Sequence, residues 1–139
     1  MREFLFRGKD VDTGKWVYGG YCKHDKVKVC FTTDDPKTKY MIIVDGSCDW
    51  GFEPPLQGYE VDPNTVGQFT GLTDKTGKLV FEGDIVDIIH QGIYKCRWDE
   101  CNFEFGFSNG NESFGIAYVS PHDFVVVGNI YDDPEMLEE

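Results

Sequence analysis

The chain has 139 residues, of which 40% are hydrophobic and 15% aromatic, and its formal net charge is −12 with an isoelectric point near 4.5. This length fits one compact domain, or a small barrel with an appendage, and the hydrophobic content excludes bulk disorder. The 25 acidic against 13 basic residues make phosphate backbones and acidic membrane surfaces poor partners.

Neither a membrane span nor an export signal is expected. The chain has no apolar run of about 18 residues, and charges at Arg2, Glu3 and Arg7 interrupt the apolar region of a secretory signal. We therefore expect a cytoplasmic protein without a membrane partner. The cysteines are odd in number and irregularly spaced, which indicates reduced thiols in such a chain. They are Cys22, Cys30, Cys48, Cys96 and Cys101.

Short strands are predicted in the first half of the chain. Residues 4–7 and 16–18 resemble the arms of a hairpin whose turn lies at residues 12–15. Residues 27–31 alternate apolar and polar side chains, as a half-buried strand does. Residues 40–44 form a short apolar run, which fits a strand buried on both faces.

The second half continues this pattern. Asp62 and Pro63 predict one helical turn, with Asp62 as the N-cap and Pro63 in the first helical position. The strands expected after it are short and bounded by polar or glycine-containing turns. They cover residues 66–72, 79–81, 85–89, 93–98, 103–107, 115–119 and 124–127. Pro134 is predicted to begin a final helical turn.

Many short strands with little helix between them indicate a mostly β fold. We expect an N-terminal β-hairpin subdomain, or small sheet, over residues 1–58, with its boundary in the glycine- and proline-containing stretch 45–58. A C-terminal SH3-like β-barrel is expected over residues 59–131. An acidic C-terminal tail follows over residues 132–139.

Three separated segments carry a family pattern. Residues 2–18 read Arg-Glu-Phe-Leu-Phe-Arg-Gly-Lys-Asp-Val-Asp-Thr-Gly-Lys-Trp-Val-Tyr. Residues 61–86 begin Val-Asp-Pro-Asn-Thr-Val-Gly-Gln-Phe-Thr-Gly-Leu and end Phe-Glu-Gly-Asp-Ile-Val. Residues 127–137 begin Val-Gly-Asn-Ile-Tyr and end Pro-Glu-Met-Leu. In this order the segments resemble the YopX family, although Asp132-Asp133 departs mildly from the family's Glu-Asn.

This resemblance implies a bacterial phage or prophage origin. It also implies an SH3-type barrel in the second half and self-association into a homo-oligomer. It implies no reaction, because the family supplies no catalytic residue that could be carried over. Nothing is transferred to residues 21–58, which the resemblance does not cover.

Two polar segments faintly resemble ligand-binding loops. Gly71 and Gly77 are separated by five residues where a P-loop has four, and Leu79 follows the lysine where a P-loop has Ser or Thr. Residues 10–14 alternate acids as an EF-hand loop does, but Lys15 and Tyr21 stand where that loop needs Gly and Glu. Both segments are interpreted as polar turns.

The cysteines lack the spacing of a zinc site. Cys22 with His24, and Cys96 with Cys101, form no Cys-x2-Cys pair of the kind that structural zinc sites use. Cys30 and Cys96 are better interpreted as small core residues. We therefore expect no metal-binding and no cofactor-binding residue.

Nucleophilic catalysis needs a thiol or hydroxyl beside an oriented base. Cys101 with His122, or Cys96 with His90, can be paired on paper, but the sequence gives no proximity for either. The acids Glu82 and Asp84 flank Gly83 and are interpreted as caps of a turn. No catalytic residue is expected.

Phe103, Phe105 and Phe107 are predicted to share one strand face. Aromatic side chains on a strand stack bases in single-strand-binding proteins, but there they lie among lysines and arginines. Here the neighbouring charges are acidic, so the interpretation is core packing. Those acids are Asp99, Glu100, Glu104 and Glu112.

The sequence favours a non-enzymatic protein-interaction module that self-associates and binds a basic host or phage protein, toward which its acidity would steer it. One alternative is a nucleic-acid-related role, through a basic patch at Lys23, Lys26 and Lys28 or through mimicry of DNA by the acids. The other is a metal-assisted enzyme. Neither the partner nor a biochemical task follows from the sequence.

Overall fold

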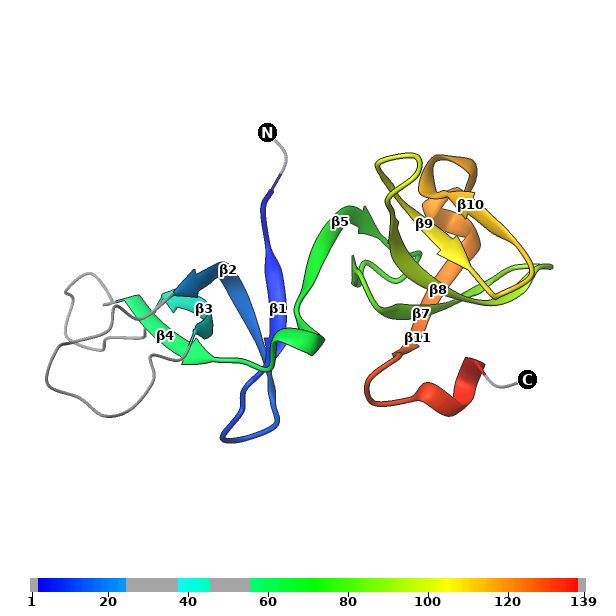
Figure 1. Ribbon diagram of the computed structural model, residues 1–139. Helices are drawn as coiled ribbons and strands as arrows, with labels where there is room; N and C mark the ends of the chain where they lie inside the picture. The colour runs from blue at the N-terminus through cyan, green and yellow to red at the C-terminus, as the bar shows by residue number, and fades with distance from the viewer. Residues whose placement is uncertain (1–2, 25–37, 46–55, 138–139) are drawn as a thin grey trace, which may run out of the picture. The chain divides into compact units, whose positions relative to one another are not determined.

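The computed structural model describes residues 3–24, 38–45 and 56–137. Within these ranges the chain is mostly β, with short 3₁₀ turns and no α-helix, so the expected fold class is confirmed. Two compact units are distinguished: Phe4–Val66, and Gly67–Glu139 together with Met1–Glu3 (Figure 1). This division falls after Val66, whereas the sequence placed a subdomain boundary after residue 58, and the predicted subdomain bounds stay a prediction.

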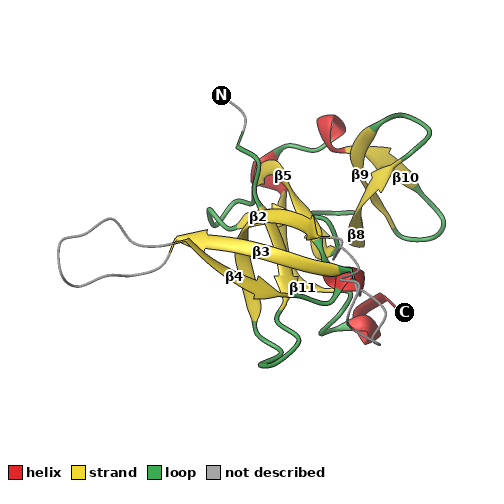
Figure 2. Ribbon diagram, turned by 60° about the vertical axis from the view of Figure 1, so that its left-hand side comes forward, coloured by secondary structure: helices red, strands yellow, loops and turns green. Residues whose placement is uncertain are grey.

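The unit Phe4–Val66 is an antiparallel sheet with the strand order β4-β3-β2-β1, of which Figure 2 shows β2, β3 and β4 side by side. The bounds are β1 Phe6–Lys9, β2 Trp16–His24, β3 Lys39–Asp45 and β4 Leu56–Glu60. The predicted hairpin is confirmed, with Arg7 opposite Tyr18. At its turn the Asp10 carboxylate accepts a hydrogen bond from the backbone N–H of Asp12 at 2.8 Å, so the segment resembling a calcium loop is a polar turn.

Strand β3 differs from its expected burial. Ile42 is fully buried, but its neighbours Met41 and Ile43 are only half-buried, so burial on both faces is wrong. The strand predicted over residues 27–31 lies outside the described residues.

The predicted helical turn is confirmed as the 3₁₀ turn η1, Pro63–Thr65. The Asp62 carboxylate accepts from the Asn64 N–H at 3.0 Å, as an N-cap does. The Thr65 hydroxyl donates to the Asp62 carbonyl at 2.7 Å and accepts from the Lys9 N–H at 2.9 Å. This hydroxyl therefore fastens the turn to the end of β1.

The unit Gly67–Glu139 contains a two-stranded hairpin and a five-stranded antiparallel sheet. The hairpin consists of β5 Gly67–Thr73 and β6 Leu79–Phe81. The sheet has the order β10-β9-β8-β7-β11, which Figure 1 shows. Its strands are β7 Asp84–Ile88, β8 Gly92–Asp99, β9 Glu104–Ser108, β10 Ser113–Gly115 and β11 Phe124–Asn129.

Two expectations for this unit need correction. No sheet of the described residues closes into a barrel, so the SH3-like barrel is not confirmed. The strand predicted over residues 115–119 is instead the 3₁₀ turn η2, Ile116–Tyr118, which leaves a shorter strand before it. Two further 3₁₀ turns are η3, Pro121–Asp123, and η4, Pro134–Leu137, and the latter is the helical turn expected at Pro134.

Among the described residues, one apolar cluster forms much of the core of this unit. It draws on four strands of the sheet, on β6 and on the segment before β11, and it includes Cys96 as expected. Its members are Val80, Val86, Ile88, Tyr94, Cys96, Phe107, Val119, Phe124 and Val126. The rings of Phe107 and Phe124 lie 5.4 Å apart across it.

The turn between β6 and β7 is held from both sides. The Gly83 N–H donates to the Cys96 carbonyl at 2.9 Å, and the Gly83 carbonyl accepts from the Ile130 N–H at 2.9 Å. Asp84 is buried and accepts from the Phe81 N–H at 2.8 Å, which confirms it as a turn cap. Gly83 has φ +93°, and a Cβ there would lie 3.0 Å from Cε2 of Tyr131.

A second buried carboxylate, that of Asp74, joins the β5–β6 hairpin to β11. It accepts hydrogen bonds from the N–H groups of Thr76, Lys78 and Val126, each at 2.9 Å, and from the Thr76 hydroxyl at 2.6 Å. Burial by itself would raise the pKa of Asp74, but these hydrogen bonds outweigh it and lower the pKa to about 2.

Replacing Gly83 by Ala is expected to destabilise the protein by about 3 kcal/mol, because a side chain at positive φ is strained and its Cβ also meets Tyr131. Gly77→Ala is the matched control, since Gly77 has φ +88° but open space around it. It should lose only the conformational term, about 1–2 kcal/mol. Urea unfolding of both variants measures the difference, and equal losses would contradict the role given to the Tyr131 contact.

Asp74→Asn is expected to cost about 2 kcal/mol at neutral pH, because an amide nitrogen would face the Val126 N–H in place of a charged acceptor. The folded-state pKa of Asp74 is depressed, so its stabilisation is present above the unfolded value of 3.8 and is lost as pH falls toward 2. Unfolding free energies measured from pH 5 to pH 2 should therefore converge for the two proteins. A constant difference over that range would show that the carboxylate charge contributes nothing.

Candidate functional site

An aromatic row runs along β8 and β9 from the core to the surface. On β8, Tyr94 and Cys96 are 1% and 2% exposed, whereas Trp98 at the end of the same face is 41% exposed. On β9, Phe107 is fully buried and Phe105 is half-buried. Because the core ends before the strands do, the row finishes as an aromatic surface.

Trp98 and Phe105 form the centre of this surface. They are direct partners in the β8–β9 register, and their rings lie 5.0 Å apart at 75° in an edge-to-face arrangement. Phe103 precedes β9, has φ 53° and is 78% exposed. The predicted core packing is therefore right for Phe107 and wrong for Phe103. Phe103 is the last residue of the tight turn before β9, so it does not follow the alternation of that strand.

Asp99 shapes that turn. Its carboxylate accepts from the Cys101 N–H at 2.9 Å, from the Asn102 N–H at 3.4 Å and from the Asn102 side-chain amide at 2.9 Å. The hydrogen bond from the Asn102 side chain, followed by the one from the Cys101 backbone, lowers the pKa of Asp99. The charged carboxylate thus holds the loop from which Phe103 projects.

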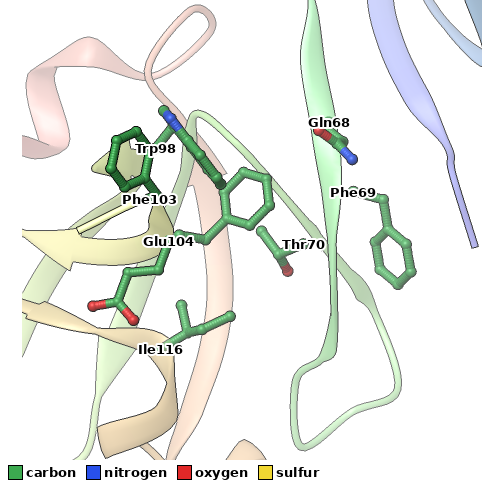
Figure 3. Close-up of a pocket in the computed structure, with 8 residues that line it drawn as sticks. Gln68, Phe69, Thr70, Trp98, Phe103, Glu104 and Ile116 are labelled. Atoms are coloured by element: carbon green, nitrogen blue, oxygen red, sulfur yellow. The ribbon is translucent and has the colours of Figure 1, made fainter. Parts of the chain in front are cut away.

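Two adjoining hollows flank the aromatic pair, and we call them together the aromatic cleft. The first has a volume of about 250 Å³ and is lined by Gln68, Phe69, Thr70, Trp98, Phe103, Glu104, Phe105 and Ile116. The second, of about 290 Å³, is lined by Gln68, Glu82, Trp98 and Phe105. In Figure 3, Thr70 projects from its strand toward the aromatic side chains, and Phe69 points to the other side of that strand.

A carboxylate belongs to each hollow. Burial raises the pKa of Glu82, and a hydrogen bond from the Gln68 backbone partly opposes that rise. Glu104 extends over Gly115, where a Cβ would collide with its carboxylate, so the glycine leaves the acid its room. Neither set of lining residues contains a lysine or an arginine.

This arrangement suits binding. Exposed aromatic faces attract cations and apolar groups, and carboxylates add a preference for positive charge. No histidine or cysteine lines either hollow. In the described ranges of the chain, no three His, Cys, Asp or Glu side chains gather as metal ligands would.

The residues weighed as nucleophiles or ligands lie elsewhere. Cys96 is in the core, whereas Cys22 and Cys101 are exposed, and none of these three cysteines forms a disulfide. His90 and His122 are both exposed, in the turn after β7 and in η3 respectively. Cys30 and Cys48 lie outside the described residues.

The proposed basic patch cannot be assembled from the described residues alone. Lys23 is exposed on β2, while Lys26 and Lys28 fall in the range that the structure does not describe. The segment that faintly resembles a P-loop, from Gly71 to Gly77, leads into the hairpin turn between β5 and β6, as expected.

Sequence reasoning missed Trp98, Gln68 and Glu82 as parts of one site. Alternation along residues 93–98 did place Trp98 on the face of Tyr94 and Cys96. What it could not give was the register that sets Trp98 against Phe105, or the point at which the core ends.

Comparison with known proteins agrees with the three-segment resemblance. The sequence model of the YopX protein family matches residues 5–138, so the chain belongs to the YopX family. The crystal structure of protein EF1440 from Enterococcus faecalis is similar in fold, with a TM-score of 0.52 and 20% identity over 99% of each chain. No curated protein matches the chain significantly. Among the residues described, no helix is long and apolar enough to cross a membrane.

Proposed function

We propose that this YopX-family member is a non-enzymatic protein-interaction module and that the aromatic cleft receives its partner. The observation that carries this proposal is the exposure of Trp98 and Phe103 side by side over a hollow. Tryptophan and other aromatics provide much of the energy of protein interfaces, and clustered exposed aromatics mark binding surfaces more often than scattered ones do.

The charge of the protein favours a basic partner of host or phage origin. The net charge of −12 steers positively charged molecules toward it, and Glu82 and Glu104 extend that preference into the cleft. Single-strand nucleic acids are poorer candidates, because stacking sites for bases surround their aromatics with lysine and arginine. The proposed setting is the cytoplasm, where exposed thiols such as Cys22 and Cys101 stay reduced.

The finer fold proposed for residues 59–131 is an open relative of the SH3-like barrel. Support comes from the sequence resemblance and from the antiparallel meander of β7, β8, β9 and β10, to which β11 adds beside β7. A barrel of that kind leaves edges, and β10 and β11 are the edge strands of this sheet.

Replacing Trp98 by Ala is expected to reduce capture of the partner at least about tenfold, because the truncation removes the centre of the aromatic surface. Tagged wild-type and variant proteins would be compared in nuclease-treated bacterial lysate, with recovered proteins quantified by mass spectrometry. Ile89→Ala is the matched control, since Ile89 is 55% exposed and lines neither hollow. Recovery of the same partner by the Trp98 variant in full amount would remove the cleft from the proposal.

Self-association into a homo-oligomer, implied by the family resemblance, is proposed as a second property. Light scattering at micromolar concentration should give a mass that is a multiple of 15.9 kDa. Trp98→Ala should leave that mass unchanged, because an acidic cleft is a poor site for an acidic copy of the same chain. A mass near 15.9 kDa would refute self-association and would leave the proposal for the aromatic cleft unaffected.

A further inference from the structure

We propose that the hollow beside Glu82 binds the guanidinium group of an arginine in an extended basic segment of the partner. This inference rests on the proposed function and names the chemistry of its site. Trp98, Phe105, Gln68 and Glu82 line one volume of about 290 Å³, so an aromatic face and a carboxylate meet in the same space. A planar guanidinium can stack on the first and pair with the second.

The chain already contains one such pairing. In the unit Phe4–Val66 the guanidinium of Arg7 lies over the ring of Trp16, with its central carbon 4.6 Å from the ring centroid. The same geometry over Trp98 would place an incoming arginine against an indole that is 41% exposed. Arginine is favoured over lysine because a guanidinium stacks and forms two parallel hydrogen bonds, whereas an ammonium is a strongly hydrated point charge.

Glu82 is suited to receive that charge. It is half-buried, and its own backbone N–H donates to the Gln68 carbonyl at 3.0 Å, which fixes the carboxylate-bearing turn against β5. Its raised pKa reflects partial desolvation, and a partly desolvated carboxylate interacts more strongly with a cation.

The occupant is an extended segment of a basic protein. The two hollows share Gln68, Trp98 and Phe105, so they lie side by side along the aromatic pair. The neighbouring hollow adds Phe103 and Ile116, which suit an apolar side chain next to the arginine. A second copy of this chain fits less well, because its net charge of −12 opposes two carboxylates.

The test uses the full-length protein and a blocked peptide, Gly-Leu-Arg-Leu-Gly, beside the same peptide with citrulline in place of arginine. Citrulline keeps the shape of the side chain and removes its charge. The indole N–H signal of Trp98, identified with a Trp98→Phe variant, reports binding in ¹⁵N NMR spectra. The arginine peptide should shift it saturably at millimolar concentration, and citrulline should weaken binding about fivefold or more.

Glu82→Gln should reduce the affinity for the arginine peptide by about fivefold while leaving the weak binding of the citrulline peptide unchanged. Asp87→Asn is the matched control, because Asp87 is an exposed carboxylate on β7 that lines neither hollow, and it should change nothing. A dispersed NMR spectrum verifies that the Glu82 variant is folded.

The outcomes separate this inference from the proposed function. Equal binding of the two peptides, binding unaffected by Glu82→Gln, or no shift at millimolar peptide would overturn arginine recognition. If Trp98→Ala still abolished capture of the partner, the cleft would remain the interaction site with another preference. If Trp98→Ala also left capture intact, both would fall.

Discussion

The register between β8 and β9 is the constraint on which the second unit depends. It sets Cys96 opposite Phe107 inside the core and Trp98 opposite Phe105 at its margin, so one pairing determines both packing and surface. A slip by one residue would turn all these side chains to the other face. Buried Tyr94 and Phe107 oppose such a slip, because exposing them would cost several kcal/mol of hydrophobic stabilisation. The exposed aromatic surface is thus specified by residues that never reach it.

The cleft also depends on the turns around it. The backbone of Glu82 is bonded to Gln68, and the adjoining Gly83 is bonded to Cys96 and Ile130, so one turn positions a wall of the cleft relative to the sheet. Asp74 secures the far end of the same hairpin to β11. These contacts are between backbone groups and buried carboxylates, which move less than exposed side chains. The site is therefore formed largely before a partner arrives, which lowers the entropic cost of binding.

Much of the fold could be predicted from local pattern. The hairpin of the first unit, the cap at Asp62 and the strand beginning near Ile85 follow from alternation and turn chemistry, which are set by neighbours in the chain. The prediction of a strand at residues 115–119 was wrong because Ile116–Tyr118 forms a 3₁₀ turn. A short apolar run in the sequence is compatible with either structure. The cleft was beyond reach for a related reason. Alternation assigns Trp98 and Phe107 to inward faces alike, but only the three-dimensional extent of the core decides which of them is covered.

The surroundings of the tryptophans give the protein a built-in optical asymmetry. Trp16 has the Arg7 guanidinium 4.6 Å and the Lys9 ammonium 5.4 Å from its ring centroid, whereas Trp98 shares its hollow with Glu82. Anionic quenchers such as iodide are drawn to the first indole, and cationic quenchers such as caesium to the second. The emission of Trp16 and the emission of Trp98 therefore differ in quencher preference, and a Trp50→Phe background removes the third tryptophan of the chain. The caesium-sensitive emission of Trp98 therefore reports on occupancy of the cleft without any label attached to the protein.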